Sequence, residues 1–564
     1  MRKSRLFAVL AVLGLLLSAC SSLPRSGDVH AVNPSKNEAG NVALVGQPPP
    51  EGATPEEIVT YFLVACRAGG EDDYAVARQY LMRSTSADWD PKTEVRVYPD
   101  NQNITTTVTE NGGVKARVGS LGTLSETGVY TESANNAVFT TDFSLAKNQD
   151  GEWRIASLED GIFLAERMFF GQLYVEAPVY FLASATDSLV ADLHWFPRRE
   201  APSRALHALL SGPSPWLRDG VTSAVPEDTR LTKNLQIDDG VARVELSPNV
   251  LAIPQRQRSL MLAQVRSTLL AFSSIQTVQI SVPGENLDKE VVLELSEYPY
   301  GSYPLSVISG GVPGTVVDQD EIELVPANPA FADLGLTDLA VAYQKPPSSY
   351  AALARSGTEL VAVDGATGTV RTLTTGASLI PPSFDSLGWI WSGERSNNGS
   401  LTVSTALEME PLTVAAPALQ GMNVRDFAVS REGSRIVIVA ESGSEVKTYV
   451  ASITRSSDGA PTSLGDLIPV GQRLADVTDV SWVGSTELMA LGRSASGSDT
   501  SLYSLRIGGP TGRALNVQEG TVALTSTRSS QPVVILTESG RVFERDGSSW
   551  RNRVSSVTSA AYPG

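Results

Sequence analysis

The sequence predicts a multidomain protein in which two α+β domains are followed by an all-β C-terminal β-propeller. The chain has 564 residues, and at about 150 residues per domain this length corresponds to three or four folded units. Up to about residue 300, segments with apolar residues at helical spacing alternate with segments in which every second residue is apolar. The remainder consists of short apolar runs separated by Gly, Ser and Asp. The composition, 42% hydrophobic and 19% charged, is typical of folded domains.

Charge and residue usage exclude several classes of function. The chain has 44 Lys and Arg against 62 Asp and Glu, a formal net charge of -18. Such a chain repels phosphate backbones, so we expect no nucleic-acid partner. It has only 3 His and 2 Cys, and a zinc site built from these residue types needs three or four of them to converge. We therefore expect neither metal nor thiol chemistry.

The first residues have the three parts of a signal peptide. Basic residues at positions 2, 3 and 5 precede an uninterrupted apolar stretch from residue 6 to 17, shorter than the ~20 residues that cross a bilayer as a helix. The stretch ends in Leu17-Ser18-Ala19-Cys20, which resembles the lipobox of bacterial lipoproteins. That resemblance implies cleavage after residues 1–19, an S-diacylglycerol on the Cys20 thiol and an N-acyl group, such as palmitate, on its amino group. An ordinary secretory signal with a chance cysteine is the alternative.

Lipidation would hold the protein on the outer face of the cytoplasmic membrane through its acyl chains. Residues 20–53 are rich in Pro, Gly, Ser and Asn, which predicts an extended tether. No second apolar stretch is long enough to span a membrane. Cys66, the only other cysteine, lies in an apolar helical run. It is either a buried inert thiol or a reactive one able to form an intermolecular disulfide, so its role stays open.

The first α+β domain is expected over residues 54–174. Thr54-Pro55-Glu56-Glu57 is a capping box that starts a helix, and a second helix should follow Asp72-Asp73. From Glu94 the apolar period changes to two, which predicts antiparallel strands around 95–97, 104–108, 114–118, 138–145 and 153–158. Two helices packed on a curved antiparallel sheet resemble the cone-shaped domains related to nuclear transport factor 2.

The second α+β domain is expected over residues 175–300. Its predicted helices cover 201–211 and 258–272, and its predicted strands cover 179–182, 229–237, 241–246, 278–282 and 291–295. Leu209 to Pro213, Val225 to Thr229 and Asp239 to Ser247 resemble, in order and spacing, the sporulation and germination module called GerMN. That resemblance implies a non-catalytic interaction domain.

Residues 301–564 are expected to form a linker and a β-propeller-like domain. A unit of apolar strand, polar turn and apolar strand recurs, with turns at Arg355-Ser356-Gly357, Arg431-Glu432-Gly433-Ser434, Gly484-Ser485 and Arg528-Ser529-Ser530. Between the first two turns we expect a degenerate copy of this unit, which contains Trp389 to Trp391. The repeat suits four-stranded blades, although it does not fix their number, and a pair of β-sandwiches is the alternative.

Catalytic motifs are missing from the sequence or lack their context. There is no Gly-Lys dipeptide for a phosphate-binding loop and no His-Glu pair for a zinc-binding helix. Ser144 to Lys147 and Ser444 to Lys447 match Ser-x-x-Lys, but no Lys-Thr-Gly accompanies them. We interpret the acidic run 318–323 as a solvated face, and His194 and His207 as packed or surface residues. We therefore expect no enzyme, no catalytic, metal or cofactor-binding residues, and no cofactor.

The lipobox, the two α+β domains and the propeller, taken in this order, resemble the LpqB family of lipoproteins. This resemblance implies a partner, the extracytoplasmic domain of the sensor histidine kinase MtrB, and a role in two-component signalling that controls cell-wall metabolism and cell division. A wall-glycan-binding or wall-remodelling protein is the alternative, with Trp389, Trp391, Trp482 and Trp550 as candidate sugar-stacking rings. The oligomeric state stays open.

Overall fold

The computed structural model describes residues 46–68, 72–287, 293–297, 303–343, 349–406, 410–495, 497–526 and 533–564. The signal peptide, Cys20 and most of the tether expected from the sequence lie outside these residues. Among the helices in the described ranges, none combines the length and apolar character needed to cross a membrane.

The first helix begins where the sequence predicts. In α2 (Pro55–Cys66), the Thr54 side chain accepts a hydrogen bond from the Glu57 backbone N–H at 3.3 Å, and the Glu57 carboxylate accepts from Thr54 N at 2.8 Å. The second helix expected after Asp72-Asp73 forms, although only as the four-residue helix α3 (Ala75–Arg78), and another short helix, α4 (Arg83–Asp88), follows it. Their separation follows from Leu81, which makes a β-bridge with Ile155 and turns the backbone toward a strand.

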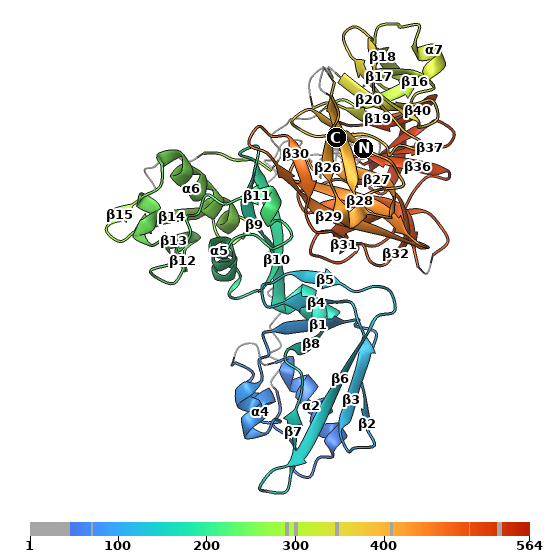
Figure 1. Ribbon diagram of the computed structural model, residues 1–564. Coiled ribbons are helices and arrows are strands. Elements are labelled where there is room, and N and C mark those ends of the chain that lie inside the picture. Colours follow the sequence, from blue (N-terminus) through green and yellow to red (C-terminus); the bar gives the residue numbers. More distant parts are fainter. Residues whose placement is uncertain are drawn as a thin grey trace, which may run out of the picture. The chain divides into compact units, whose positions relative to one another are not determined.

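Two four-stranded sheets complete the first domain. One has the order β5-β4-β1-β8, from β5 (Tyr130–Glu132), β4 (Gly122–Ser125), β1 (Glu94–Tyr98) and β8 (Ile162–Ala165). The other has the order β2-β3-β6-β7, from β2 (Thr105–Val108), β3 (Val114–Gly119), β6 (Val138–Lys147) and β7 (Trp153–Ser157), and Figure 1 shows β2, β3 and β6 side by side. The first sheet is mixed, because β1 and β8 are parallel, whereas the sequence predicts antiparallel strands only.

The second domain has two sheets and two long helices. After the π-helix η1 (Arg167–Leu173), one sheet has the order β10-β9-β11, from β10 (Leu189–Pro197), β9 (Tyr174–Ala183) and β11 (Val221–Thr222). The other has the order β12-β13-β14-β15, from β12 (Gln236–Asp238), β13 (Val241–Glu245), β14 (Thr277–Val282) and β15 (Glu285–Asn286). Helices α5 (Ala201–Ser211) and α6 (Gln255–Leu270) share one hydrophobic core with both sheets. Short 3-10 turns η2 (Arg218–Gly220) and η3 (Pro248–Leu251) connect these elements.

Two predicted strands of this domain are wrong in whole or in part. Most of 229–237 is irregular, with a single bridge from Leu231 to Leu246, and only its end enters β12. Residues 293–295 form no strand, and residues 291 and 292 lie outside the described part. Strand β10 was not predicted, because eight of its residues are buried in succession and so lack the alternation of a half-exposed strand.

The described residues from 305 onward form six blades, which confirms the β-propeller and rules out a sandwich pair. The first blade contains β16 (Ser306–Ser309), β17 (Val312–Asp318), β18 (Glu321–Leu324) and β40 (Val557–Ala561). After the short helix α7 (Phe331–Leu334), the second contains β19 (Thr337–Val341), β20 (Ser349–Ala354), β21 (Glu359–Asp364) and β22 (Val370–Thr375). The third contains β23 (Ser383–Phe384), β24 (Trp389–Ser392), β25 (Ser400–Thr405) and β26 (Leu412–Ala415), followed by η4 (Pro417–Leu419).

The fourth blade contains β27 (Asn423–Val429), β28 (Arg435–Ser442) and β29 (Glu445–Arg455), together with β30 (Pro461–Leu464) and β31 (Ile468–Val470), which both pair with β29. Parallel pairing of β30 with β26 joins the third and fourth blades in one nine-stranded sheet. The fifth contains β32 (Leu474–Trp482), β33 (Glu487–Ser494), β34 (Ser501–Arg506) and β35 (Leu515–Asn516). The sixth contains β36 (Thr521–Thr525), β37 (Val534–Thr537), β38 (Val542–Asp546) and β39 (Ser549–Val554).

The ring closes between distant parts of the chain. Strand β40 pairs antiparallel with β16, so the first blade takes its innermost strand from the end of the domain and its other strands from the beginning. The predicted turns at Arg431 and Gly484 lie between the first two strands of their blades, and the predicted turn at Arg355 lies between the two middle strands of its blade. The turn at 528–530 lies outside the described residues.

Candidate functional site

The structure gives Cys66 a packing role and leaves Cys20 untested. Cys20 lies outside the described residues, so its lipidation stays a prediction. Cys66, at the end of α2, is a free cysteine with 2% of its surface exposed. Burial raises the pKa of its thiol. Because the thiolate is the reactive form, this environment supports the inert interpretation of Cys66.

Neither Ser-x-x-Lys match has the geometry of a catalytic pair. Ser144 and Lys147 both lie in strand β6, whereas that chemistry places the two residues at the start of a helix. Ser444 lies in the turn before β29, and Lys447 Nζ is 2.8 Å from Glu445 Oε2 in a solvent-exposed ion pair. The acidic run 318–323 forms the β17–β18 hairpin. Within the described ranges, no group of three or more His, Cys, Asp or Glu side chains is arranged to hold a metal ion.

His194 is a buried structural residue on β10. Its Nδ1 lies 2.8 Å from Thr127 O, and its Nε2 lies 3.3 Å from Asp192 Oδ2. Asp192 in turn accepts hydrogen bonds from the backbone N–H and hydroxyl of Ser214 at 2.8 and 3.0 Å. Burial alone would lower the pKa of His194, but the hydrogen bond and charge of Asp192 outweigh it and raise that pKa. His207 is exposed on α5.

Three of the four tryptophans proposed for sugar stacking are buried. Trp389, Trp391 and Trp482 are 8%, 0% and 4% exposed. Trp550 is half-buried, and its Nε1 donates to Asn516 O at 3.0 Å. A glycan-binding face needs several exposed rings beside one another, and these four residues do not provide it.

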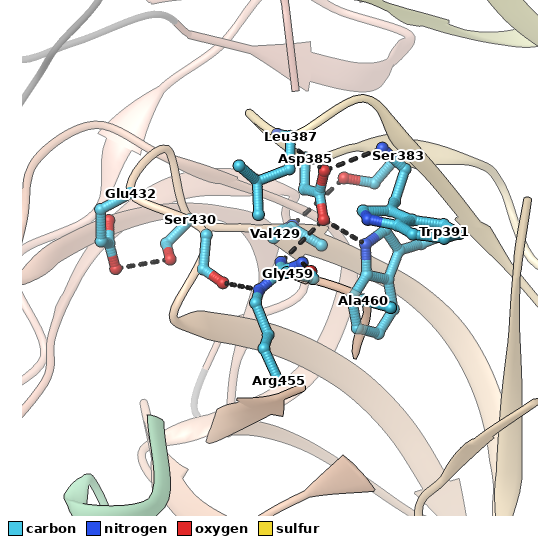
Figure 2. Close-up of polar contacts among 12 residues, drawn as sticks. Ser383, Asp385, Leu387, Trp391, Val429, Ser430, Glu432, Arg455, Gly459 and Ala460 are labelled. Carbon is cyan, nitrogen blue, oxygen red and sulfur yellow. Dashed lines mark hydrogen bonds and ion pairs between the residues drawn. The ribbon is translucent and has the colours of Figure 1, made fainter. Parts of the chain in front are cut away.

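A buried ion pair connects the third and fourth blades (Figure 2). Arg455, at the end of β29, lies with its Nη2 2.7 Å from Asp385 Oδ2, and the two side chains are 2% and 0% exposed. Asp385 also accepts hydrogen bonds from Trp391 Nε1 at 3.2 Å and from two backbone N–H groups of its own turn. Every oxygen of this carboxylate is therefore satisfied, as a buried charge requires.

The Glu132 carboxylate, at the end of strand β5 in the first domain, contacts the fifth blade. Glu132 is 6% exposed and accepts hydrogen bonds from Thr511 N at 2.8 Å, Thr511 Oγ1 at 2.6 Å and Gln472 N at 3.1 Å. Burial raises the pKa of Glu132, although the hydrogen bonds from Thr511 oppose that shift. The Asn135 side-chain amide donates to Arg473 O at 2.7 Å beside it.

Strand β10 of the second domain contacts the fourth and fifth blades. Trp195 Nε1 donates to Gly508 O at 2.8 Å. A Cβ at Gly508 would lie 3.1 Å from Leu193 O, and its φ of +77° favours glycine, so this close approach depends on that residue. Arg435, fully buried in β28, donates to Glu432 at 2.7 Å and to Ala191 O at 3.3 Å. Buried polar contacts therefore connect the propeller to both preceding domains.

The propeller has a channel along its axis. Its cavity has a volume of about 510 Å³ and is lined by residues of the innermost strands β19, β23, β27, β32, β36 and β40. Four of its lining residues are exposed, and each lies near the beginning or middle of its strand: Asp338, Asn423, Thr478 and Val522. The channel is therefore accessible from the end where these strands begin.

Hydrogen bonds around the channel connect neighbouring blades. In each, a side-chain oxygen on one innermost strand accepts from a backbone N–H on the innermost strand of the next blade or just after it. The pairs are Ser383 with Val429 at 3.1 Å, Asp426 with Val480 at 3.1 Å, Asp479 with Leu524 at 2.7 Å, Thr525 with Tyr562 at 3.0 Å and Ser559 with Leu339 at 2.9 Å. These bonds hold the carboxylates of Asp426 and Asp479 at the channel wall.

Asp426 and Asp479 interact directly with each other. Burial and the neighbouring carboxylate raise the pKa of Asp426 well above its ordinary value, and burial raises the pKa of Asp479 to about 6. The hydrogen bond between the two groups favours the proton on Asp426 and the charge on Asp479.

The sequence patterns did not identify the channel aspartates, the Asp385–Arg455 pair or Glu132, although a repeated motif marks the aspartates. The pattern apolar-x-Asp-apolar recurs as Leu336 to Leu339, Val424 to Phe427 and Val477 to Val480, at the innermost strands of three blades. Comparing the repeats at this position would have found Asp338, Asp426 and Asp479. No such signal exists for Asp385 and Arg455, or for Glu132, whose partners are distant in the chain.

Three domain families match consecutive parts of the chain. The lipoprotein LpqB N-terminal domain matches residues 48–170, the sporulation and spore germination domain residues 178–288, and the lipoprotein LpqB β-propeller domain residues 314–563. Lipoprotein LpqB of Cutibacterium acnes is 24% identical over 98% of both chains. Lipoprotein LpqB of Streptomyces avermitilis is 26% identical over 100% of this chain and 98% of its own. The first GerMN domain of GerM from Bacillus subtilis is 25% identical over 22% of this chain and 92% of its own, with a TM-score of 0.19.

Proposed function

Because the chain belongs to the LpqB family of lipoproteins, we propose that it is lipidated on Cys20 and held on the outer face of the cytoplasmic membrane. There it binds the extracytoplasmic domain of a sensor histidine kinase of the MtrB type and changes the output of that kinase. Through this two-component system it affects cell-wall metabolism and cell division. The protein acts by binding and not by catalysis.

The observation that carries this proposal is the complete domain order. All three matched domains follow one another in this chain, behind a lipobox in the sequence. The Ser-x-x-Lys pairs lie on strands or in turns, and buried contacts of Glu132, Trp195 and Arg435 join the propeller to the other domains. These features support a protein that presents broad faces to a partner.

Membrane anchoring supplies the physical basis for regulation. Two acyl chains confine the protein to the plane of the membrane, which raises its effective concentration beside a membrane-bound kinase. Binding alone changes nothing if the lipoprotein has equal affinity for both signalling states of the kinase. Regulation therefore requires that the lipoprotein bind one state more tightly than the other.

The test reconstitutes the full-length lipidated protein and the full-length kinase in the same liposomes. We expect autophosphorylation of the kinase to change with the surface density of the lipoprotein and to saturate. The Cys20→Ala variant, added to the same liposomes at the same bulk concentration, should give a much weaker response because it is not confined to the membrane. Cys66→Ala is the matched control and should behave as the unaltered protein.

Equal kinase output with and without saturating lipoprotein would contradict the proposal. In-cell crosslinking of the native protein separates the remaining alternative. Crosslinks to the extracytoplasmic domain of a kinase support the proposal, whereas recovery of only peptidoglycan fragments or wall-synthesis enzymes supports a wall-directed function.

A further inference from the structure

A second cavity lies where the second domain meets the seam between the third and fourth blades. Its volume is about 230 Å³, and it is lined by Pro215, Trp216, Asp219, residues 416–419 and residues 464–467. We call it the seam pocket, because its blade residues follow or end β26 and β30, the two strands that join the blades (Figure 1). The volume lies below the ~300–1,000 Å³ typical of small-molecule sites, so the pocket suits a few side chains of a peptide.

The tight packing of η2 on the fourth blade fixes the wall of the pocket that contains Trp216. A Cβ at Gly220, the last residue of η2, would lie 2.8 Å from Ser434 O and 2.9 Å from Ser452 Cβ, so this approach depends on glycine. Trp216, two residues before η2, packs against the core of the second domain and against a core of the fourth and fifth blades. The wall is therefore preformed, and binding loses little free energy in ordering it.

The indole of Trp216 offers both an apolar surface and a hydrogen-bond donor. The side chain is half-buried, and its Nε1 donates to no other residue in the described part of the chain. Trp482 differs in this respect, because its Nε1 donates to Ala428 O at 3.0 Å. Pro417 and Ala418 are exposed and extend the apolar surface to solvent. A ring with an unused N–H beside apolar groups is typical of a surface that binds a partner.

The charge at the rim of the seam pocket has one sign. Asp219 and Asp466 line it and are exposed, and within the described ranges neither forms an ion pair. The lining contains no Lys, Arg or His, and the neighbouring Arg218 does not belong to it. The whole chain has a net charge of -18, which attracts basic partners over a longer range. The charge therefore selects a basic occupant.

We propose that the seam pocket binds a proline-rich segment of another protein, in the polyproline II conformation and with a basic residue beside the prolines. A polyproline II chain has no internal hydrogen bonds, so its carbonyl oxygens are free to accept from Trp216 Nε1. Its proline rings pack on the indole and on Pro417, as in other aromatic-lined grooves that take such segments. The basic side chain lies beside Asp219 or Asp466.

The chain's own prolines do not fill the seam pocket. Pro48-Pro49-Pro50 is absent from its lining, and the preceding Gln47 O accepts a hydrogen bond from Tyr80 Oη of the first domain at 2.8 Å. A partner must therefore supply the segment. This inference goes beyond the proposed regulation of a kinase and does not depend on it.

Fluorescence anisotropy with labelled peptides tests the seam pocket on the full-length protein in detergent. The probe is Arg-Pro-Pro-Pro-Pro-Arg, blocked at its C-terminus and labelled at its N-terminus with fluorescein. Arg-Ala-Ala-Ala-Ala-Arg keeps the charge without the prolines, and Glu-Pro-Pro-Pro-Pro-Glu keeps the prolines with the opposite charge. We expect the probe to bind and both comparison peptides to bind about tenfold more weakly or less.

The blocking variant leaves every buried residue in place. Ala418 is exposed and lines the pocket, so Ala418→Arg fills the pocket and places a fixed cation beside its aspartates, which should abolish binding. Ala332→Arg, at an exposed position of α7 in the second blade, is the matched control and should bind as the unaltered protein does.

Two milder variants separate the hydrogen bond from the charge. Trp216→Phe keeps an aromatic ring without the N–H and should weaken binding about threefold to tenfold. Asp466→Asn should weaken binding of the probe and make it less dependent on salt. Asp546→Asn, on the exposed β38–β39 turn, should leave both properties unchanged.

Binding of the probe that is lost in Ala418→Arg and kept in Ala332→Arg supports the inference. It is overturned if the probe does not bind at millimolar concentration, if the alanine peptide binds equally well, or if Ala418→Arg binds as the unaltered protein does. Sedimentation velocity covers the other occupant: a dimer of the unaltered protein that dissociates in Ala418→Arg would show that a second copy covers the pocket, and would also overturn the inference.

Discussion

Asp385 and Arg455 lie 70 residues apart in the sequence, yet their side chains form an ion pair of 2.7 Å that is almost completely shielded from water. The pair joins the turn after β23 to the end of β29, so it connects the third blade to the fourth. In the same region β26 and β30 pair in parallel and merge the two blades into one sheet. The third and fourth blades therefore form one unit, held by backbone and side-chain contacts together.

Removal of the carboxylate from this pair should destabilise the propeller strongly. Asp385→Ala leaves the Arg455 guanidinium buried without its partner and the Trp391 indole N–H without an acceptor, at an expected cost of about 3–5 kcal/mol. Chemical denaturation of the full-length protein, followed by tryptophan fluorescence, measures the change. Glu200→Ala is the control, because its ion pair with Arg204 is solvent-exposed, and it should have little effect. If both variants had the same free energy of unfolding, the buried ion pair would contribute no more to stability than the exposed one.

The Glu132 carboxylate should slow hydrogen exchange of the backbone N–H groups that it binds in the fifth blade. In Glu132→Ala the backbone N–H groups of Gln472 and Thr511 lose their acceptor, so we expect their exchange with deuterium to become about tenfold faster or more. Hydrogen exchange with mass spectrometry on the full-length protein measures the rate in peptides covering these residues. Glu126→Ala, in an exposed turn of the same domain, should leave the rate unchanged. Unchanged exchange in Glu132→Ala would mean that other contacts hold this surface.

The two cysteines should differ completely in modification. Metabolic labelling with an alkyne fatty acid should label the unaltered protein and Cys66→Ala, but not Cys20→Ala, since only Cys20 lies in a lipobox. Mass spectrometry of the N-terminal peptide identifies the attached group. Labelling of Cys20→Ala would assign lipidation to a different residue.

The Cys20→Ala variant also isolates the remaining thiol. Because burial raises the pKa of Cys66, we expect its reaction with a thiol reagent to be negligible in the folded protein and complete in guanidinium chloride. A colorimetric thiol assay with and without denaturant measures both values. Rapid reaction of the folded protein would show that Cys66 is accessible and reactive.

His194 should make stability depend on pH in a defined direction. Its pKa is raised in the folded state, above an unfolded value of about 6.5. The stabilisation is therefore fully present below about pH 6.5 and is lost as pH rises through the folded-state pKa. The difference in unfolding free energy between the unaltered protein and His194→Gln should thus be larger at pH 5.5 than at pH 8.5.

Denaturation at the two pH values provides the measurement for His194. His207→Gln is the matched control for loss of an exposed imidazole. A difference for His194→Gln that grows toward high pH would show that the Asp192 contact does not stabilise the protonated ring.

Local patterns predicted the elements whose cause is local. The capping box at Thr54 placed the start of α2, the helical pattern placed α5 at 201–211, and the turn at Arg431 to Ser434 placed the β27–β28 hairpin. These features depend on neighbours within a few residues, so the sequence carries them directly. The number of blades did not follow, because divergent repeats do not show which strands pair.

Contacts between distant segments were not predictable in the same way. The bridge from Leu81 to Ile155 shortened a helix that its own periodicity favoured, and the continuous burial of β10 removed the alternation that identifies a strand. Asp385 looked like any other turn aspartate, because its partner Arg455 reaches it only in the folded ring. Tertiary context decides such cases, and one sequence does not contain it in readable form.

The pairing of β40 with β16 has a consequence for biosynthesis. A growing polypeptide contains β16 about 250 residues before the strand that must lie beside it. Until residues 557–561 arrive, the hydrogen-bonding groups of β16 face solvent as an open edge, which invites pairing with another chain. A polypeptide truncated shortly before this strand would thus be recognised by quality-control proteases, even though nearly every other strand of the ring had been translated.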